Sequence, residues 1–336
     1  MVLATVSRTH GSTPQKPGSS ALFCEKGLVS GTVGGGIVEG KVQQIALEAA
    51  KTKESGHFQF DLTYDISNPN EAICGGHISV LIDANLRKSI PVFEQVKQSV
   101  KKRIPGVLIT MVTGIAEKNV LINRYWMSET FTQSLPLEYI DKIEPVVLSL
   151  ISTGNPGDYR EVEFEISGKE SFSWVFLEPI FPPAQLVIAG AGHVGKALTH
   201  IGCLLDFEVI VIDDRPEYAN MENLPDADHI IVEDIGKAMQ GLKKGPDTYV
   251  VIVTRGHKDD AEALKPCIGS DLAYAGMIGS KKKISAMRMS FIEKGWATDE
   301  QWDCVNTPIG LDIKSQTVEE IAISIAAQLV LVRNSK

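Results

Sequence analysis

The second half of the chain alternates between apolar strand patterns and helical patterns, and this alternation constrains the fold more than any other feature. Strands separated by helical stretches are typical of a parallel, doubly wound sheet. We therefore expect a Rossmann-type domain here. The strand patterns lie at 185–190, 208–213, 229–232, 248–254 and 273–279, and the helical patterns at 194–205 and 259–267.

A glycine-rich turn follows the first of these strands. Gly190, Gly192 and Gly195 form the sequence G-A-G-H-V-G directly before a helical pattern. In such a turn the first glycine allows a tight bend, the second admits a phosphate or pyrophosphate, and the third lets helix and strand pack closely. Asp213 and Asp214 end the second strand, where an acidic side chain can accept hydrogen bonds from a ribose. The alternative is a plain tight turn followed by a solvated acidic loop.

Loops also follow the later strands of this half. Because the carboxyl ends of parallel strands meet at one edge of a sheet, we expect these loops to lie close to the glycine turn. Lys282 and Lys283 are more simply interpreted as solvating the start of a helix. His193 and His257 suit a structural hydrogen bond as well as a ligand contact. The candidate ligand-binding residues of this edge are Gly190, Gly192, His193, Gly195, Asp213, Asp214, Arg255, His257, Gly279 and Ser280.

The chain is expected to close with a helix that starts after Thr317. Glu320 follows three residues later, which is the spacing of a capping box. The nearly apolar stretch 321–332 is too short to cross a bilayer, so it predicts a buried helix.

The first half reads as a mixed α/β domain with a partly antiparallel sheet. A segment with three prolines, 178–185, separates it from the Rossmann-type half. We therefore predict an amino-terminal domain at 1–177, a linker at 178–185 and a nucleotide- or pterin-phosphate-binding domain at 186–336. The strand patterns of the first half lie at 2–7, 20–23, 28–33, 57–62, 77–82, 107–112, 120–125, 161–166 and 173–177, and a helical pattern lies at 38–51.

Two loops of this first half are candidate ligand contacts. Gly34, Gly35 and Gly36 precede a helix and can wrap an oxygen-rich ligand with backbone amides, although a tight turn explains them equally well. Cys74 stands before Gly75 and Gly76, where a thiol is accessible to a ligand, whereas most lone cysteines are inert packing residues.

Composition excludes several classes of protein. The net charge of -9 leaves no large basic face for nucleic acid. The amino terminus shows no signal-peptide pattern, and no stretch suits a membrane span. The five cysteines include no C-x-x-C pair, which argues against a disulfide framework and a structural zinc site. We expect a protein of the reducing cytoplasm.

Taken in order, the motifs resemble the xanthine dehydrogenase accessory proteins of the XdhC/CoxI family. The resemblance covers both halves, and the stretch 88–172 contributes least. The motifs that carry it are LATVSRTHGSTPQKPGS, GTVGGGIVEG, AICGGHISVLID, LVIAGAGHVGKAL, VIDDRPEYAN, VTRGHKDD, AYAGMIGSKKK and TPIGLDIKSQTVEEIAISIAAQLV.

The resemblance implies a chaperone that binds the molybdenum cofactor, as molybdopterin or its cytosine dinucleotide form. It implies that the cofactor is sulfurated with a cysteine desulfurase-like sulfur donor and delivered to an apo molybdenum hydroxylase of the xanthine dehydrogenase type. Such a protein has no turnover of its own. The family's glycine loop commonly carries a cysteine where this chain has Ile37, so Cys74 becomes the candidate metal contact. This role requires the amino-terminal loops to face the carboxyl edge of the Rossmann-type sheet.

Two other functions remain open at this point. An NAD(P)-dependent oxidoreductase would use the same Gly190 turn, but His193 and His257 are ambiguous as proton donors or acceptors. A nucleotide-sensing regulatory protein would share the fold. The sequence also leaves open whether the protein forms a homodimer.

Overall fold

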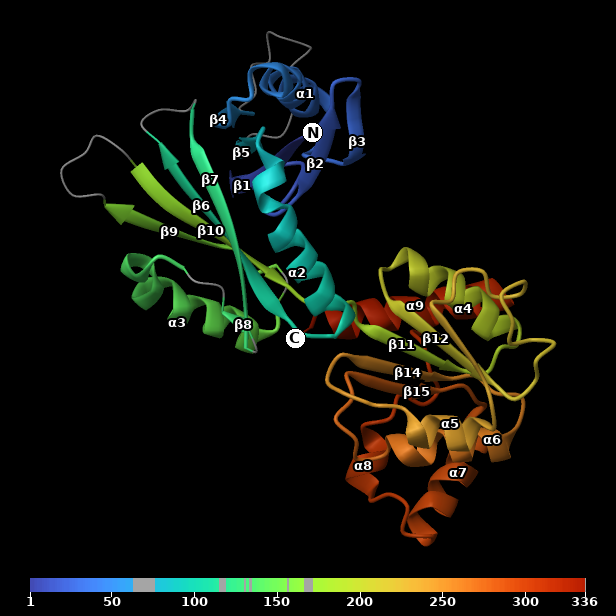
Figure 1. The fold of residues 1–336 in the computed structure, drawn as a ribbon. Helices are drawn as coiled ribbons and strands as arrows, with labels where there is room; N and C mark the ends of the chain where they lie inside the picture. The colour runs from blue at the N-terminus through green and yellow to red at the C-terminus, as the bar shows by residue number, and fades with distance from the viewer. Residues whose placement is uncertain are drawn as a thin grey trace. The chain divides into compact units, whose positions relative to one another are not determined.

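The chain divides into two units, Met1–Pro182 and Pro183–Lys336. The structure is a computed structural model (Figure 1) and describes residues 1–62, 76–114, 119–129, 131–132, 135–155, 157–165 and 172–335. The predicted fold class is confirmed, because antiparallel sheets in the first unit precede a parallel Rossmann-type sheet in the second. The first unit departs from a single mixed sheet, since its described strands form two separate antiparallel sheets.

The first antiparallel sheet has the strand order β3-β2-β1-β5-β4. Apolar residues of α1 at helical spacing, among them Val38, Val42 and Ala46, pack on alternate residues of β1. This contact forms the core of the sheet. Its elements are β1 (Val2–His10), β2 (Ser20–Cys24), β3 (Gly27–Gly31), α1 (Gly36–Thr52), β4 (Gly56–Asp61) and β5 (His77–Asp83).

The second antiparallel sheet has the order β8-β7-β6-β10-β9. Helix α3 packs into one core with the sheet, and α2 packs around Leu108 and Trp126 in another. Pro179 lies in β10 beyond the last residue paired with β9, so its missing N–H breaks no bond on that side. The elements are η1 (Leu86–Ser89), α2 (Ile90–Lys101), β6 (Gly106–Gly114), β7 (Leu121–Ser128), β8 (Phe131–Thr132), α3 (Leu137–Thr153), β9 (Arg160–Glu165) and β10 (Phe172–Ile180).

The second unit is built on a parallel sheet with the order β13-β12-β11-β14-β15. Its three central strands are buried on both faces, which explains their continuous apolar runs. The order reverses beside β11, and ligands of open α/β sheets bind at such a reversal. The strands are β11 (Gln185–Ala189), β12 (Glu208–Asp213), β13 (His229–Val232), β14 (Thr248–Ile252) and β15 (Tyr274–Met277).

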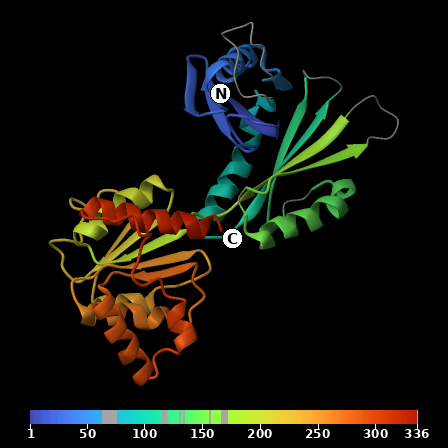
Figure 2. The ribbon, with the colours of Figure 1, turned by 180° about the vertical axis from the view of Figure 1, so that it is seen from behind.

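Helices cover both faces of this sheet (Figure 1). Residues of α4 and α9 pack on one face, and residues of α5, α6, α7 and α8 pack on the other. Figure 2 shows α9 lying across the sheet beside α4. The helices are α4 (His193–Leu204), α5 (Ile235–Gly241), α6 (His257–Leu264) with η2 (Lys265–Cys267), α7 (Lys281–Glu293), α8 (Asp299–Asp303) and α9 (Val318–Arg333).

Helix α9 tests two predictions about the end of the chain. The capping box is confirmed, because Thr317 and Glu320 bond each other's backbone amides. The prediction of a buried helix is wrong for one side: Ile323 is 52% and Leu331 54% exposed, while the stripe that contains Ile325 is buried. None of the described helices has the length and apolar composition that a membrane crossing requires.

Candidate functional site at the carboxyl edge of the parallel sheet

The predicted glycine turn joins β11 to α4, and two of its glycines are required by the chain's own packing. Gly190 has a φ of 114°, and a Cβ on it would lie 2.6 Å from the carbonyl oxygen of Val253 on the neighbouring β14 connection. A Cβ on Gly195 would collide with the carbonyl oxygen of Gly190. Because these two positions carry no side chain, α4 can pack closely against β11 and the β14 connection.

Gly192 differs from both. Its φ of -69° suits any residue, and no described atom beyond the adjoining residues of the chain lies within 4 Å of where its Cβ would be. Gly192 is the N-cap of α4 and makes no side-chain cap, so the amides of the first helical turn lack that partner. The turn therefore offers an open space beside uncapped amides, which is the geometry of a phosphate site.

Asp213 holds this turn in place. Its side chain is 2% exposed. Oδ2 accepts hydrogen bonds from the Ala191 amide at 2.7 Å and Arg215 Nη2 at 2.9 Å. Oδ1 accepts from the Arg215 amide at 3.0 Å and Arg215 Nε at 2.9 Å. Burial opposes its ionisation, but the bonds from Arg215 and Ala191 outweigh burial and hold the pKa of Asp213 below its ordinary value.

Arg215 is fixed from its other side as well, because its guanidinium lies 4.0 Å from the ring centre of Tyr218. We call the Asp213–Arg215 pair with its bond to Ala191 the clasp. The clasp fills the usual acceptor directions of the Asp213 carboxylate, which leaves Asp214 as the more open acid at the end of β12.

Asp214 and Arg255 connect the loops on either side of the turn. Arg255 Nη2 lies 3.2 Å from Asp214 Oδ2, and Arg255 Nε lies 3.7 Å from Asp259. His257 and His193 are exposed at the first positions of α6 and α4. The structure thus brings these predicted residues to one edge of the sheet.

The loop after β15 contributes Gly279 and Ser280. Ser280 Oγ accepts from the Lys283 amide at 3.3 Å and caps α7. The prediction that Lys283 only solvates the helix start is wrong, because its ammonium forms an ion pair with the fully buried Asp260. Thr254 Oγ1 donates to Asp260 at 2.7 Å, so this network ties α6 to α7.

Sequence reasoning missed Arg215, Thr254 and Asp260. Burial raises the pKa of Asp260, and hydrogen bonds from Lys283 and Thr254 oppose that rise. The available signal was position alone: Arg215 and Thr254 closely follow the ends of parallel strands, and Asp260 lies in the first turn of the next helix. Nothing in such a pattern reveals which acid faces inward.

The amino-terminal glycine loop has a different backbone. Gly34, Gly35 and Gly36 have φ values of 135°, 66° and 58°, which favour glycine whether or not a ligand is bound. A Cβ on Gly34 would lie 2.8 Å from Pro14, and a Cβ on Gly35 3.8 Å from Glu39. The loop precedes α1, whose N-cap Gly35 makes no side-chain cap.

The predicted cysteine site belongs to the segment before β5. Cys74 and Gly75 lie outside the described residues. A Cβ on Gly76 would lie 2.5 Å from the carbonyl oxygens of His10 and Ser12, so packing alone requires this glycine. The cysteines within the described ranges are free thiols, and no cluster of metal-binding side chains occurs there.

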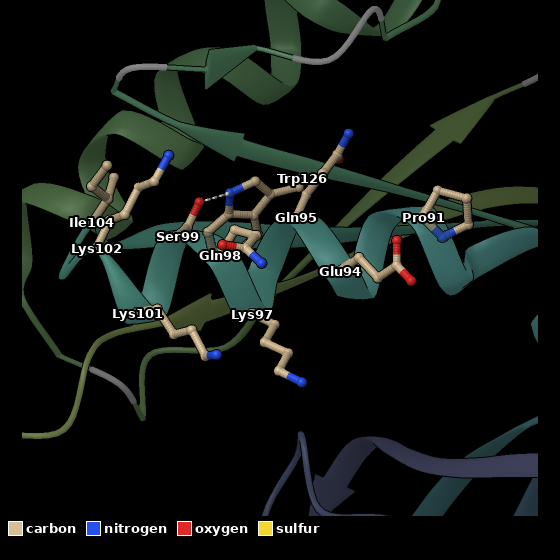
Figure 3. Close-up of a pocket in the computed structure, with 10 residues that line it drawn as sticks. All are labelled: Pro91, Glu94, Gln95, Lys97, Gln98, Ser99, Lys101, Lys102, Ile104 and Trp126. Atoms are coloured by element: carbon tan, nitrogen blue, oxygen red, sulfur yellow. Dashed lines mark hydrogen bonds between the residues drawn. The ribbon is translucent and has the colours of Figure 1, made fainter.

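A separate hollow of about 780 Å³ lies along α2 beside Trp126. Trp126 Nε1 donates to Ser99 Oγ at 2.9 Å, and none of the predicted site residues line this hollow. Figure 3 shows the side chains of Lys97 and Lys101 directed away from the indole.

Two family models match the chain. The XdhC Rossmann domain matches residues 186–329, and the XdhC and CoxI family matches residues 1–61. Together these matches reach both units and cover more than half of the residues.

Two known proteins are similar to this chain in sequence. A protein of Bacillus subtilis strain 168 that is described as a probable xanthine dehydrogenase component is 25% identical over 334 residues, or 99% of this chain and 93% of that protein. "Uncharacterized protein YqeB" of Escherichia coli strain K12 is 34% identical over 152 residues, or 45% of this chain and only 28% of that protein.

A solved structure extends the similarity to the fold. The crystal structure of a protein described as a xanthine dehydrogenase from Bacillus halodurans has a TM-score of 0.76 and 25% identity, covering 100% of this chain and 92% of that one. The predicted resemblance is confirmed: the chain belongs to the XdhC and CoxI family.

Proposed function

We propose that this chain is an accessory protein of a molybdenum hydroxylase of the xanthine dehydrogenase type. It binds the molybdenum cofactor as cargo, supports its sulfuration by a cysteine desulfurase-like donor, and delivers it to the apo hydroxylase. Support comes from the family membership and from the relatives whose names refer to xanthine dehydrogenase. The chain itself carries out no turnover in this proposal.

One observation carries the proposal: the open space at Gly192. Neither its backbone conformation nor any neighbouring atom requires a glycine there. A phosphate of the cofactor fits this space, since it accepts hydrogen bonds from the first-turn amides of α4 and benefits from the helix dipole. Arg255 and the exposed His193 and His257 lie at the same edge and supply further donors.

The same geometry weakens the oxidoreductase alternative. An NAD(P) enzyme of this fold binds a ribose through the acid that ends the second strand. Here the carboxylate of Asp213 bonds Ala191 and Arg215 instead. We therefore propose that the Gly190 turn binds the cofactor's terminal phosphate. Asp214 is then the acid that would contact a nucleotide form of the cofactor.

The test is anaerobic purification of the chain from cells that make the cofactor, followed by metal and pterin analysis. We expect bound molybdenum and pterin, and activation of the apo hydroxylase by the loaded protein. Gly192→Val should lower the bound cofactor at least about tenfold, because its side chain occupies the phosphate space. Gly241→Val is the matched control, since a Cβ at Gly241 also meets no described atom within 4 Å.

Two results would refute this proposal. One is a parent protein that carries neither molybdenum nor pterin and leaves hydroxylase activation unchanged. The other is a Gly192→Val protein loaded as fully as the parent.

Cys74 has a separate role in the proposal, as a soft thiolate contact for the metal or its exchangeable sulfur. Cys74→Ser should keep the affinity for the pterin phosphate but shorten the lifetime of the sulfurated cofactor and lower hydroxylase activation. Cys203→Ser, which replaces an exposed thiol, is the control. Equal activation by parent and Cys74→Ser would make Cys74 a packing residue.

A further inference from the structure

A groove of about 720 Å³ lies between α6 and α7, on the face of the parallel sheet that α5, α6, α7 and α8 cover. The two helices follow β14 and β15 and contact each other (Figure 1), so both run from the carboxyl edge of the sheet toward its amino edge. Pockets of this volume suit molecules of nucleotide size. Two of the predicted site residues, Arg255 and His257, line the groove.

The floor of the groove is apolar, and its shape follows from small side chains. Ala261 on α6 and Ala286 on α7 leave the space between the helices open. Beneath them Met287 and Phe291 are buried in the core, and the half-buried Trp296 closes the far end. Such a floor can hold a flat apolar ring.

Cations outnumber acids around the groove, although the whole chain has a net charge of -9. Arg255, Lys258, Lys283 and Lys294 line it, against Glu262 as the acidic lining residue. Arg255 and Lys283 already have carboxylate partners. No ion pair to Lys258 or Lys294 occurs within the described residues, so these two cations remain available to a bound anion.

The two available cations mark opposite ends. Lys258 lies in the first turn of α6 and lines the groove together with Arg255. Lys294 follows α7 and lies 4.5 Å from the ring centre of Trp296. Lys283 pairs with Asp260 in the first turn of α6, and Lys294 lies 11 positions later, just past the end of α7, which corresponds to about 16 Å. A ligand in the groove therefore meets phosphate-binding groups at one end and an aromatic ring at the other.

We propose that the α6–α7 groove is a second binding site, which takes a nucleoside monophosphate. The phosphate binds Lys258 and the uncapped amides at the start of α6, and the base lies over Met287 toward Trp296. Asp259 in the first turn opposes an anion, but Arg255 lies 3.7 Å from it and offsets its charge. This proposal does not depend on cofactor binding at Gly192.

Calorimetric titration of the full chain with the four ribonucleoside monophosphates tests it. At least one should bind with a Kd below about 1 mM, and at least about tenfold more tightly than its nucleoside or inorganic phosphate. Ala286→Trp, at an exposed position of α7, should fill the groove and weaken binding at least about tenfold. Lys258→Glu should weaken it similarly, whereas Lys243→Glu makes the same charge change outside the groove and should have no effect.

Three results would overturn the second site: no monophosphate binds below about 1 mM, the nucleotide binds no more tightly than inorganic phosphate, or Ala286→Trp and Lys258→Glu bind like the parent. Gly192→Val separates this site from the glycine turn. It should leave nucleotide binding unchanged, and a loss of binding in that variant alone would place the nucleotide at Gly192 instead. Circular dichroism of each variant confirms folding.

Discussion

The glycine turns before α4 and α1 look alike in sequence but differ in what requires their glycines. At Gly34, Gly35 and Gly36 every φ is positive, so the backbone conformation alone accounts for the residue type. In the Gly190 turn the packing of β11, α4 and β14 requires Gly190 and Gly195. Among these six glycines, Gly192 is the one whose φ and neighbouring atoms do not require glycine.

This difference teaches how a glycine-rich turn can indicate a ligand. A glycine with a positive φ or a close neighbour is explained by the fold. A glycine with an ordinary φ and open space beside it leaves room for a ligand, and at Gly192 that space adjoins the uncapped amides of α4. The following substitutions separate these cases by their effects on stability and on binding.

Gly190→Val should have the largest effect on stability. Valine resists a φ of 114°, and its Cβ would press on the carbonyl oxygen of Val253. We expect a loss of about 4 kcal/mol or more in the free energy of unfolding, measured by chemical denaturation. A loss under about 1 kcal/mol, comparable to that of Gly241→Val, would show that packing does not require Gly190.

Asp213→Ala should cost about 3 kcal/mol, because it leaves the Ala191 amide and the Arg215 guanidinium without their partner. Asp214→Ala is the control and should cost under about 1 kcal/mol, since that carboxylate is 42% exposed. The clasp also predicts equal losses of binding for phosphate ligands with and without a ribose. A loss confined to the ribose form would return Asp213 to the role of a nucleotide contact.

Acid unfolding checks the same clasp. The pKa of Asp213 is lower in the folded protein than in the unfolded chain. Its contribution to stability is therefore fully present above the ordinary carboxyl pKa of about 4 and is lost as the pH falls toward the folded value. Asp213→Ala should show a shallower loss of stability in this range than the parent, and parallel pH profiles would contradict the clasp.

Gly36→Ala should have a smaller effect. The φ of 58° lies in the left-handed region, but a Cβ there meets no described atom within 4 Å. We expect a cost of about 1 kcal/mol from the backbone alone, seen as a lower Tm. Gly36→Asn should recover part of it, because asparagine tolerates this region, and an asparagine variant less stable than the alanine variant would contradict the backbone explanation.

The parallel half was predictable from sequence because alternation fixes its layers and capping fixes its last helix. The central stretch was harder: α3 contains Pro145, which a sequence pattern interprets as a helix break, and α2 was not predicted. That the candidate residues lie at one edge of the parallel sheet was predictable from their places at strand ends. The clasp was not, because spacing places Asp213 after a strand without showing whether its carboxylate faces a ligand or is bound by Arg215 two residues later.

Among these substitutions, Gly192→Val should have the smallest effect on stability, and its effect on binding is the most informative. Gly192→Val should lower the free energy of unfolding by less than about 1 kcal/mol, because nothing in the fold occupies the space of its side chain. The direct test is calorimetric titration of Gly192→Val, Gly241→Val and the parent with molybdopterin, the metal-free pterin phosphate. The account predicts that Gly192→Val folds normally and binds at least about tenfold more weakly than the other two. Equal affinities in all three proteins would contradict it, because Gly192 would then have no ligand to explain it.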